Sequence, residues 1–317
     1  MAIEEKRSGA AVLAAFVPIW ALTVVGYVAG RTGVLGLGAV DVLGRFVFYV
    51  AMPAALLDTL IRQPITGLAG EGVAAFVGAT VAVGAVGVGV ARWGFRRSLG
   101  EQAIAGMAAG YVNAGNLGIP VAVQVLGDAS FIAVVLLIQT SILTPLILGT
   151  LDLARQEDAG GRWRRLVTVP LRSPVMLACL AGVTLGAAGV RLPALLAGVV
   201  TLLGAAAVPS ALVALGLSLV RTDVADPVPA RPVEVALSVL LKSCVQPVVC
   251  FVLARFALDL HGAALFAAVL CSALPTAQNT FVFARAYGVD GRFPRDAVVA
   301  STAVSMVTLT AVAALLG

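Results

Sequence analysis

Residues 113–120 read Asn-Ala-Gly-Asn-Leu-Gly-Ile-Pro and lie inside a long apolar span. Two amides, two glycines and a proline in such a span predict a broken helix, because proline lacks a backbone donor and clashes with the preceding turn. In a membrane, lipid supplies no partner for the backbone groups that the break frees. A broken helix at this depth therefore has to be buried in protein or line a cavity.

A second stretch of this kind begins at Ser272 and reads Ser-Ala-Leu-Pro-Thr-Ala-Gln-Asn-Thr. Two interrupted spans at corresponding places in the halves of a chain are typical of the binding site of a secondary transporter. We assign the helix breaks to five residues: Gly115, Gly118, Pro120, Pro275 and Thr280.

These two stretches resemble a known family. Asn113 with Gly118-Ile-Pro120 and Gly127, and Leu274-Pro275 followed by Phe281-Val-Phe-Ala, are similar to the two crossover helices of the auxin efflux carrier family. That family includes the plant PIN carriers and bacterial organic-acid permeases. The resemblance covers the whole chain. PIN-type carriers have a second proline where this chain has Thr280, so the breaking point of the second helix stays open.

The resemblance implies a fold, a mechanism and partners. In that family the two broken helices cross at the substrate site, and a mobile core carries the substrate past a scaffold. Numbered along the chain, segments 1, 2, 6 and 7 would form the scaffold, and segments 3 to 5 and 8 to 10 the transport core. The partners would be a small organic anion, the lipid bilayer and a second copy bound through the scaffold segments.

The composition is that of an all-α polytopic membrane protein. The chain has 317 residues, of which 60% are hydrophobic and 12% charged, and its mean hydropathy is +1.04. A soluble domain carries about twice that charged fraction. Since a spanning helix needs roughly 20 apolar residues, we predict ten transmembrane segments: Ala11–Ala29, Phe46–Ile61, Val73–Ala91, Ala103–Val125, Phe131–Leu151, Val175–Ala188, Leu195–Val220, Val233–Ala254, Ala263–Ala284 and Ala297–Leu316.

The positive charges predict the orientation. Loops after odd-numbered segments hold 15 of the lysines and arginines, and the other side, tails included, holds 5. This bias places the odd-numbered loops in the cytoplasm and both termini outside the cell membrane. The pI near 9.4 reflects this topology and does not indicate nucleic acid. With a single histidine, His261, and no paired cysteine spacing, the chain suggests no metal site and no cofactor.

The two halves repeat. Eight residues recur 156 positions later without a gap: Pro18, Gly26, Gly30, Gly33, Val34, Pro53, Ala55 and Leu56 match Pro174, Gly182, Gly186, Gly189, Val190, Pro209, Ala211 and Leu212. Because five segments separate the copies, the second enters the membrane in the opposite direction. We therefore expect two inverted five-helix repeats, 1–152 and 173–317, joined by a cytoplasmic linker over 153–172, with broken crossover helices in segments 4 and 9.

Four amides are the candidate substrate-binding residues. Asn113 and Asn116 are three positions apart and share a face of any helix that contains both. Gln278 and Asn279 take the mirrored place in segment 9. Half-helix N-termini at a crossover attract anions, which favours binding. The alternative is that the amides cap the broken helices and hold neighbouring helices together.

Two charged residues lie in or near spans. Lys242 is the only basic residue deep in a segment, where it could neutralise a substrate carboxylate or carry a proton. It could equally bond carbonyls freed by Pro247, or snorkel to the interface. Asp58 stands four residues before Arg62, which favours a local ion pair, although segment 2 could also face the moving domain.

The sequence thus predicts a secondary transporter that exports a small carboxylate by elevator-type alternating access. Neither crossover contains an acidic residue, so a sodium- or proton-coupled symporter like the bile-acid transporters is the alternative. A channel would be separated from a carrier by saturation and counterflow. An intramembrane enzyme would need a metal cluster, an acidic pair or a nucleophile with its base, and the spans offer none of these.

Overall fold

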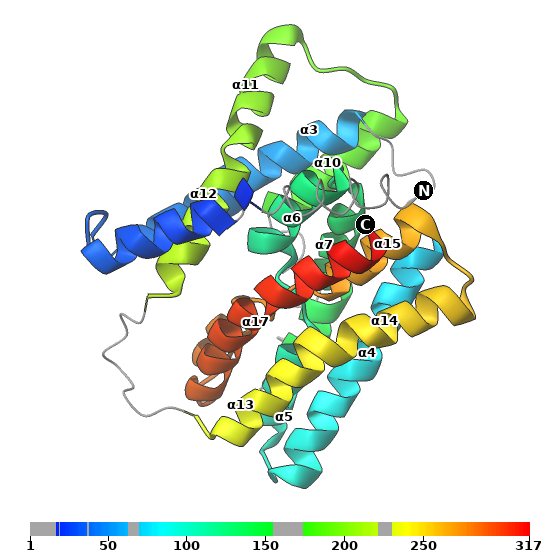
Figure 1. The fold of residues 1–317 in the computed structure, drawn as a ribbon. Coiled ribbons are helices and arrows are strands. Elements are labelled where there is room, and N and C mark those ends of the chain that lie inside the picture. Colours follow the sequence, from blue (N-terminus) through cyan, green and yellow to red (C-terminus); the bar gives the residue numbers. More distant parts are fainter. Residues whose placement is uncertain (1–16, 19, 37, 63–69, 155–173, 221–229) are drawn as a thin grey trace. The chain divides into compact units, whose positions relative to one another are not determined.

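The structure is a computed structural model that describes the chain except residues 1–16, 19, 37, 63–69, 155–173 and 221–229 (Figure 1). Every regular element of the described residues is a helix, and one isolated β-bridge joins Val112 and Thr276. The start of predicted segment 1 and nearly all of the linker 153–172 fall outside the described residues.

Six helices of the described chain are long and apolar enough to cross a membrane. They have 24 to 26 residues each and are Ala39–Arg62, Glu71–Gly94, Ser130–Ala154, Ala194–Leu217, Pro232–Ala257 and Arg292–Leu316. Three shorter apolar helices cover Ala114–Leu126, Leu177–Ala187 and Gly262–Ser272. The protein is therefore a multi-pass integral membrane protein. The count of ten spans stays a prediction.

The chain folds into two compact units. The first contains Met1–Ala69, Ala114–Leu137 and Pro170–Thr222, and the second contains Gly70–Asn113, Ile138–Val169 and Asp223–Gly317. The helix Ser130–Ala154 passes from the first unit into the second. The predicted division into five-helix repeats is of a different kind, since each compact unit draws on both halves of the sequence.

The first unit is a bundle of glycine-rich helices. Its elements are a helix over residues 20–32, α2 (Ala39–Phe46), η1 (Val47–Ala51), α3 (Met52–Arg62), η3 (Ala114–Gly118), α6 (Ile119–Val121), η4 (Ala122–Leu126), α7 (Ser130–Ile138), α10 (Pro174–Ala187), α11 (Ala194–Ala205) and α12 (Ala207–Ser218). The η elements are π-helical turns, most of them within longer helices. Helix α3 packs against α10 and α11, and α12 packs against α2, η3 and α6.

Glycines let the helices of this unit approach at backbone distance. A Cβ on Gly26 would lie 2.2 Å from the Val213 carbonyl oxygen, and one on Gly182 would lie 2.8 Å from Leu60 Cβ and 3.4 Å from the Leu57 carbonyl oxygen. Gly26 and Gly182 are 156 positions apart, and so are Leu57 and Val213. The sequence offset of the predicted repeat thus also relates the packing partners of these glycines.

The second unit contains the remaining helices. These are α4 (Glu71–Gly89), η2 (Val90–Gly94), α5 (Leu99–Gly110), η5 (Gln139–Leu143), α8 (Thr144–Ala154), α13 (Pro232–Leu240), η6 (Leu241–Val245), α14 (Gln246–Val252), η7 (Leu253–Ala257), α15 (Gly262–Ser272), α16 (Asn279–Ala286) and α17 (Arg292–Leu316). Helix α4 contacts α5, α14 and α15, and α17 lies beside α13 (Figure 1). Around Ile104 and Leu151 the helices α5, α8 and α16 share a buried apolar cluster.

Two helix ends of this unit have the same construction. After η2, Arg96 adopts a left-handed φ of 52°, and after η7, Asp259 adopts a φ of 49°. The Arg97 N–H donates to the Ala91 carbonyl at 2.9 Å, and the Leu260 N–H donates to the Ala254 carbonyl at 2.8 Å. The offset is 163 positions in each case: from Arg96 to Asp259, from Arg97 to Leu260 and from Ala91 to Ala254. Segments 3 and 8 therefore end in matching turns, each of which leads into an interrupted helix.

Candidate crossing of two broken helices

The two interrupted stretches meet within the second unit. Helix α5 ends at Gly110 and helix α15 ends at Ser272, and helical structure resumes at Ala114 and Asn279. Between these ends, the Asn113 N–H donates to the Pro275 carbonyl at 2.8 Å and the Ala277 N–H donates to the Tyr111 carbonyl at 3.1 Å. Each break thus supplies partners for the backbone groups of the other, as burial in a membrane requires.

Side chains complete the capping of α5. The last carbonyl groups of a helix have no partner inside the helix. Here the Ala108 carbonyl accepts from Thr276 Oγ1 at 2.7 Å, and the Val112 carbonyl, in the break, accepts from Gln139 Nε2 at 3.1 Å. The Gly110 carbonyl accepts from Gln246 Nε2 at 3.0 Å. Three amide or hydroxyl donors from other segments therefore hold this end in place.

Lys242 caps the end of α15. Its side chain is 0% exposed, and Nζ donates to the Ser272 carbonyl at 3.1 Å and to Gln246 Oε1. Gln246 Nε2 also donates to Thr80 Oγ1 at 3.0 Å. Lys242 and Gln246 thus connect the C-terminal ends of α5 and α15 with α4. Neither snorkelling nor a bond to a carbonyl freed by Pro247 describes this lysine, because its carbonyl partner belongs to another segment.

The predicted binding amides fall into both units. Asn113 is buried at the first break, Gln278 is half-buried at the end of the second, and Asn279 is exposed as the first residue of α16. Asn116 lies in η3, which belongs to the first unit. The backbone bond from Asn113 to Pro275 brings Asn113 close to the second break. The binding role of all four amides stays a prediction.

The first break lies earlier in the chain than its glycines and proline. Gly115, Gly118 and Pro120 all belong to the helical run from Ala114 to Leu126. The non-helical residues are 111–113, whose backbone is paired with the second break. In the second stretch, Pro275 lies within the break and Thr280 in the first turn of α16, where its hydroxyl is buried without a hydrogen-bond partner among the described residues.

Asp58 belongs to a small polar cluster in the first unit. Arg62 Nε donates to Asp58 Oδ1 at 2.9 Å, Arg62 Nη2 donates to Thr201 Oγ1 at 3.2 Å, and Thr201 Oγ1 donates to Asp58 Oδ2 at 3.3 Å. The cluster joins α3 to α11. Asp58 therefore has a local ion pair as its explanation, and no further role follows from its contacts.

An ion pair joins the turn after η2 to helix α13 in the second unit. Arg97 forms a two-pronged bond to Glu234, with Nε to Oε1 at 3.0 Å and Nη2 to Oε2 at 2.5 Å, and it also donates to Glu101 Oε1 at 2.9 Å. The hydrogen bond to Glu234 raises the pKa of Arg97 above its usual value, and partial burial opposes this rise. On the loop before α17, hydrogen bonds from Arg292 lower the pKa of Asp290.

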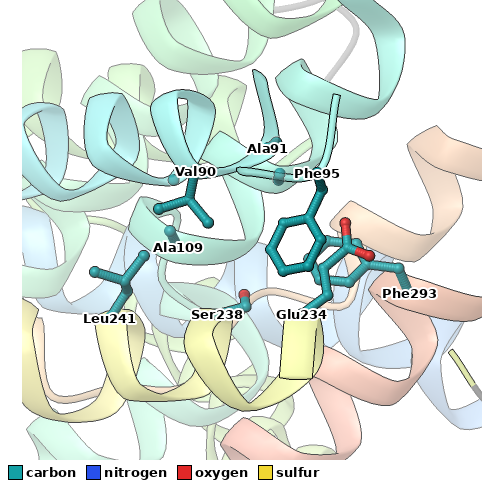
Figure 2. A pocket seen from close by; sticks show the side chains of 10 residues that line it. Val90, Ala91, Phe95, Ala109, Glu234, Ser238, Leu241 and Phe293 are labelled. Carbon is teal, nitrogen blue, oxygen red and sulfur yellow. The ribbon is translucent and has the colours of Figure 1, made fainter. Parts of the chain in front are cut away.

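Two hollows in the second unit differ in what they could hold. The pocket in Figure 2 is lined by the polar side chains of Glu234 and Ser238 and by the rings of Phe95 and Phe293. Its volume of about 10 Å³ is room for one water molecule and excludes a substrate. An open groove of about 230 Å³ runs along α4, α5 and α8 and reaches Thr80, Gly110 and Tyr111 beside the first break.

Several residues of the crossing were not singled out in the sequence. Gln246, Thr276, Gln139 and Ser301 each donate to or accept from backbone groups of the two breaks, Ser301 through its Oγ at 3.2 Å from the Thr276 nitrogen. Their one visible signal is polarity inside an apolar span. Gln246 also stands four positions after Lys242, which places the two on one helix face.

The fold and this crossing define a polytopic membrane protein of the transporter class. A profile of the family described as "Membrane transport protein" matches residues 11–160 and 164–313. The chain belongs to that family, the auxin efflux carrier family, and is a transporter and not an enzyme.

Two relatives are similar along nearly their whole length. A protein of Rhizobium meliloti (strain 1021) named "Putative malonate transporter" is 28% identical over 305 residues, 92% of each chain. A protein of Methanothermobacter thermautotrophicus named "Uncharacterized transporter" is 27% identical over 296 residues, 91% of this chain and 93% of its own.

Proposed function

We propose that this protein carries a small organic anion with one or more carboxylates across the cell membrane, and that the substrate binds where the two broken helices cross. The observation that carries the proposal is the backbone pairing of Tyr111–Asn113 with Pro275–Ala277. Interrupted helices at membrane depth are tolerated where they line a cavity, and they are where carriers bind their substrates.

The chemistry at the second break suits an anion. Helix α16 begins at Asn279 and directs its positive dipole end toward this break. The amide of Gln278 and the buried hydroxyl of Thr280 add hydrogen-bond donors there. Because one relative is named for malonate, a short dicarboxylate is the first substrate to test. Asn113, whose N–H bonds the Pro275 carbonyl, completes the proposed site.

We further propose an alternating-access mechanism of the elevator type built on an inverted repeat. The offset of 156 relates both sequence positions and glycine contacts in the first unit, and the offset of 163 relates two helix ends in the second. Two mirrored halves can adopt inward-open and outward-open states of similar energy.

Export is the proposed direction. In a cell that is negative inside, the membrane potential favours the exit of an anion by about 2.3 kcal/mol per charge per 100 mV. Neither break contains an acidic side chain that could hold a sodium ion or relay a proton. Electrical work alone can therefore drive export, and a coupled symporter is the alternative function.

The test is transport by the purified protein in proteoliposomes. Labelled malonate, lactate and indole-3-acetate would be offered, with a potential of either sign. We expect saturable uptake of at least one acid and acceleration by unlabelled acid on the opposite side, which a channel does not show. If no acid meets both criteria, the carrier function proposed here is wrong.

Variants of the amides test the position of the site. Asn113→Ala and Gln278→Ala should each raise KM for the carried acid about tenfold or more, the effect of one hydrogen bond to a charged group. Gln124→Ala is the control, since Gln124 is an exposed amide in η4, outside both breaks. Unchanged KM in both Asn113→Ala and Gln278→Ala would exclude these side chains from the site.

A further inference from the structure

We infer that Lys242 is a resident cation of the crossing. Its ammonium balances the negative charge at the C-terminal ends of α5 and α15, as a bound alkali ion would otherwise do. The inference deepens the proposed function, because it concerns the same crossing and predicts that transport is independent of sodium. It starts from the partners of Lys242, which are oxygen atoms only: Gln246 Oε1 and the Ser272 carbonyl.

The crossing brings two negative helix ends together. Each helix C-terminus carries a partial charge of roughly −0.5, and the bridge between Val112 and Thr276 fixes the stretches that follow α5 and α15 side by side. In transporters, such ends and unwound carbonyls are where coupled cations bind. A positive charge would stabilise two such ends where they are buried together.

Lys242 is the one buried cation of the described chain. The other buried charges there are Asp152, near the end of α8, and Glu234, in the first turn of α13 where Arg97 pairs with it. No carboxylate of the described residues lies within ion-pair distance of Lys242. The titratable group that acts on it is the thiol of Cys250, on the same continuous helix. Backbone and amide oxygens must therefore balance its charge.

The amide of Gln246 links Lys242 to the C-terminal end of α5. Its Nε2 donates to the Gly110 carbonyl and to Thr80 Oγ1, both at 3.0 Å. Because a carbonyl can only accept and an ammonium can only donate, the amide has one orientation that serves both neighbours. Its oxygen faces Lys242 and its nitrogen faces Gly110. The pair acts as a positioning device that holds both ends and does not itself need to touch the substrate.

The experiment removes the ammonium and offers it back as a solute. In sodium-free proteoliposomes, Lys242→Ala should lower kcat for the carried acid about tenfold or more, and ethylammonium or propylammonium should restore it. Propanol, which has a similar size and no charge, should not. Cys244→Ala is the matched control, because Cys244 lies in the same π-helical turn with its side chain exposed, and it should transport like the parent.

A second measurement does not depend on transport. The melting temperature of Lys242→Ala in detergent should rise with propylammonium chloride and not with the same concentration of propanol, while the parent should respond to neither. Should Lys242→Ala not fold, Lys242→Gln takes its place in the transport assay, because it keeps a donor for the Ser272 carbonyl without the charge. The melting data stand even if no tested acid is carried, so a failure of the substrate proposal would be recognised separately.

Three outcomes would overturn the inference. The first is parental transport by both Lys242→Ala and Lys242→Gln. The second is equal rescue by propanol and propylammonium, which would mean that only the volume of the side chain matters. The third is a parent protein that transports only with sodium present, because a free cation would then be needed in addition to the lysine.

Discussion

Gly216 offers the sharpest test of the packing in the first unit. A Cβ at this position would lie 2.0 Å from the Thr23 carbonyl oxygen, 2.7 Å from the Tyr27 nitrogen and 2.9 Å from the Gly26 Cα. All three atoms belong to the backbone of the neighbouring helix, so no side chain can rotate away. An ordinary contact needs about 3.4 Å, so helix 20–32 and α12 would have to separate by more than 1 Å. Overpacking of this kind costs about 1–3 kcal/mol, and we expect Gly216→Ala to reach the upper end.

Gly198 provides the matched control. It lies in α11 of the same unit, and a Cβ there meets nothing within 4 Å. Gly198→Ala should therefore be neutral or stabilise by about 0.5–1 kcal/mol through helix propensity. Thermal unfolding of both purified variants in one detergent measures the difference. The packing argument fails if Gly216→Ala melts with the parent, or if Gly198→Ala loses as much stability as Gly216→Ala.

Three further predictions concern charge. Glu234→Gln should destabilise the second unit by about 1–3 kcal/mol, below the range for fully buried pairs because Arg97 is 23% exposed; Glu101→Gln, which removes a more exposed partner, should cost less in the same melting assay. Asp290→Asn should reduce the free energy of unfolding by at most about 1 kcal/mol at neutral pH, which lowers the melting temperature slightly. Because the pKa of Asp290 is lowered from 3.8, its contribution is present above that pH and is lost as the pH falls below it, so parent and variant should converge in acid. The C-terminus should face outside. A reporter that is active only outside the cytoplasm should therefore be active when fused after Gly317, and activity of a reporter that works only in the cytoplasm would refute the orientation.

The broken stretches could be recognised from the sequence because amides, glycines and prolines contradict an apolar span locally. Lys242 could be recognised for the same reason, as a charge where none is expected. What a local pattern cannot give is the partner. The pairing of Val112 with Thr276 joins residues 164 positions apart, and it lies between the end of α5 at Gly110 and the start of η3 at Ala114. The glycines after Asn113 then follow a helical path, although their propensity favours a break.

The same limit applies to the capping residues. Gln246 and Thr276 are ordinary polar residues in the sequence, and their importance comes from carbonyl groups that other segments bring to them. A lysine in a span predicts a function without saying which. The sequence could not show that the Ser272 carbonyl and the Gln246 amide are the partners of Lys242.

The two prolines should differ in importance. Pro275 lies in the break, and its missing N–H prevents the i to i−4 bond that would extend α15. Its carbonyl accepts from the Asn113 N–H. Pro275→Ala restores the donor and allows α15 to continue, which would remove both the crossing bond and the positive end of α16, so we expect transport to fall about tenfold or more while the protein still inserts.

Pro120, by contrast, lies within a helical run whose preceding break is already fixed by residues 111–113. Pro120→Ala adds one backbone donor to a continuous helix and should leave most of the transport rate intact. Measured side by side in proteoliposomes, the two variants separate two causes. If Pro120→Ala loses as much transport as Pro275→Ala, proline itself sets the first break; if both transport like the parent, neither proline holds the crossing, and the pairing around Val112 and Thr276 suffices without them.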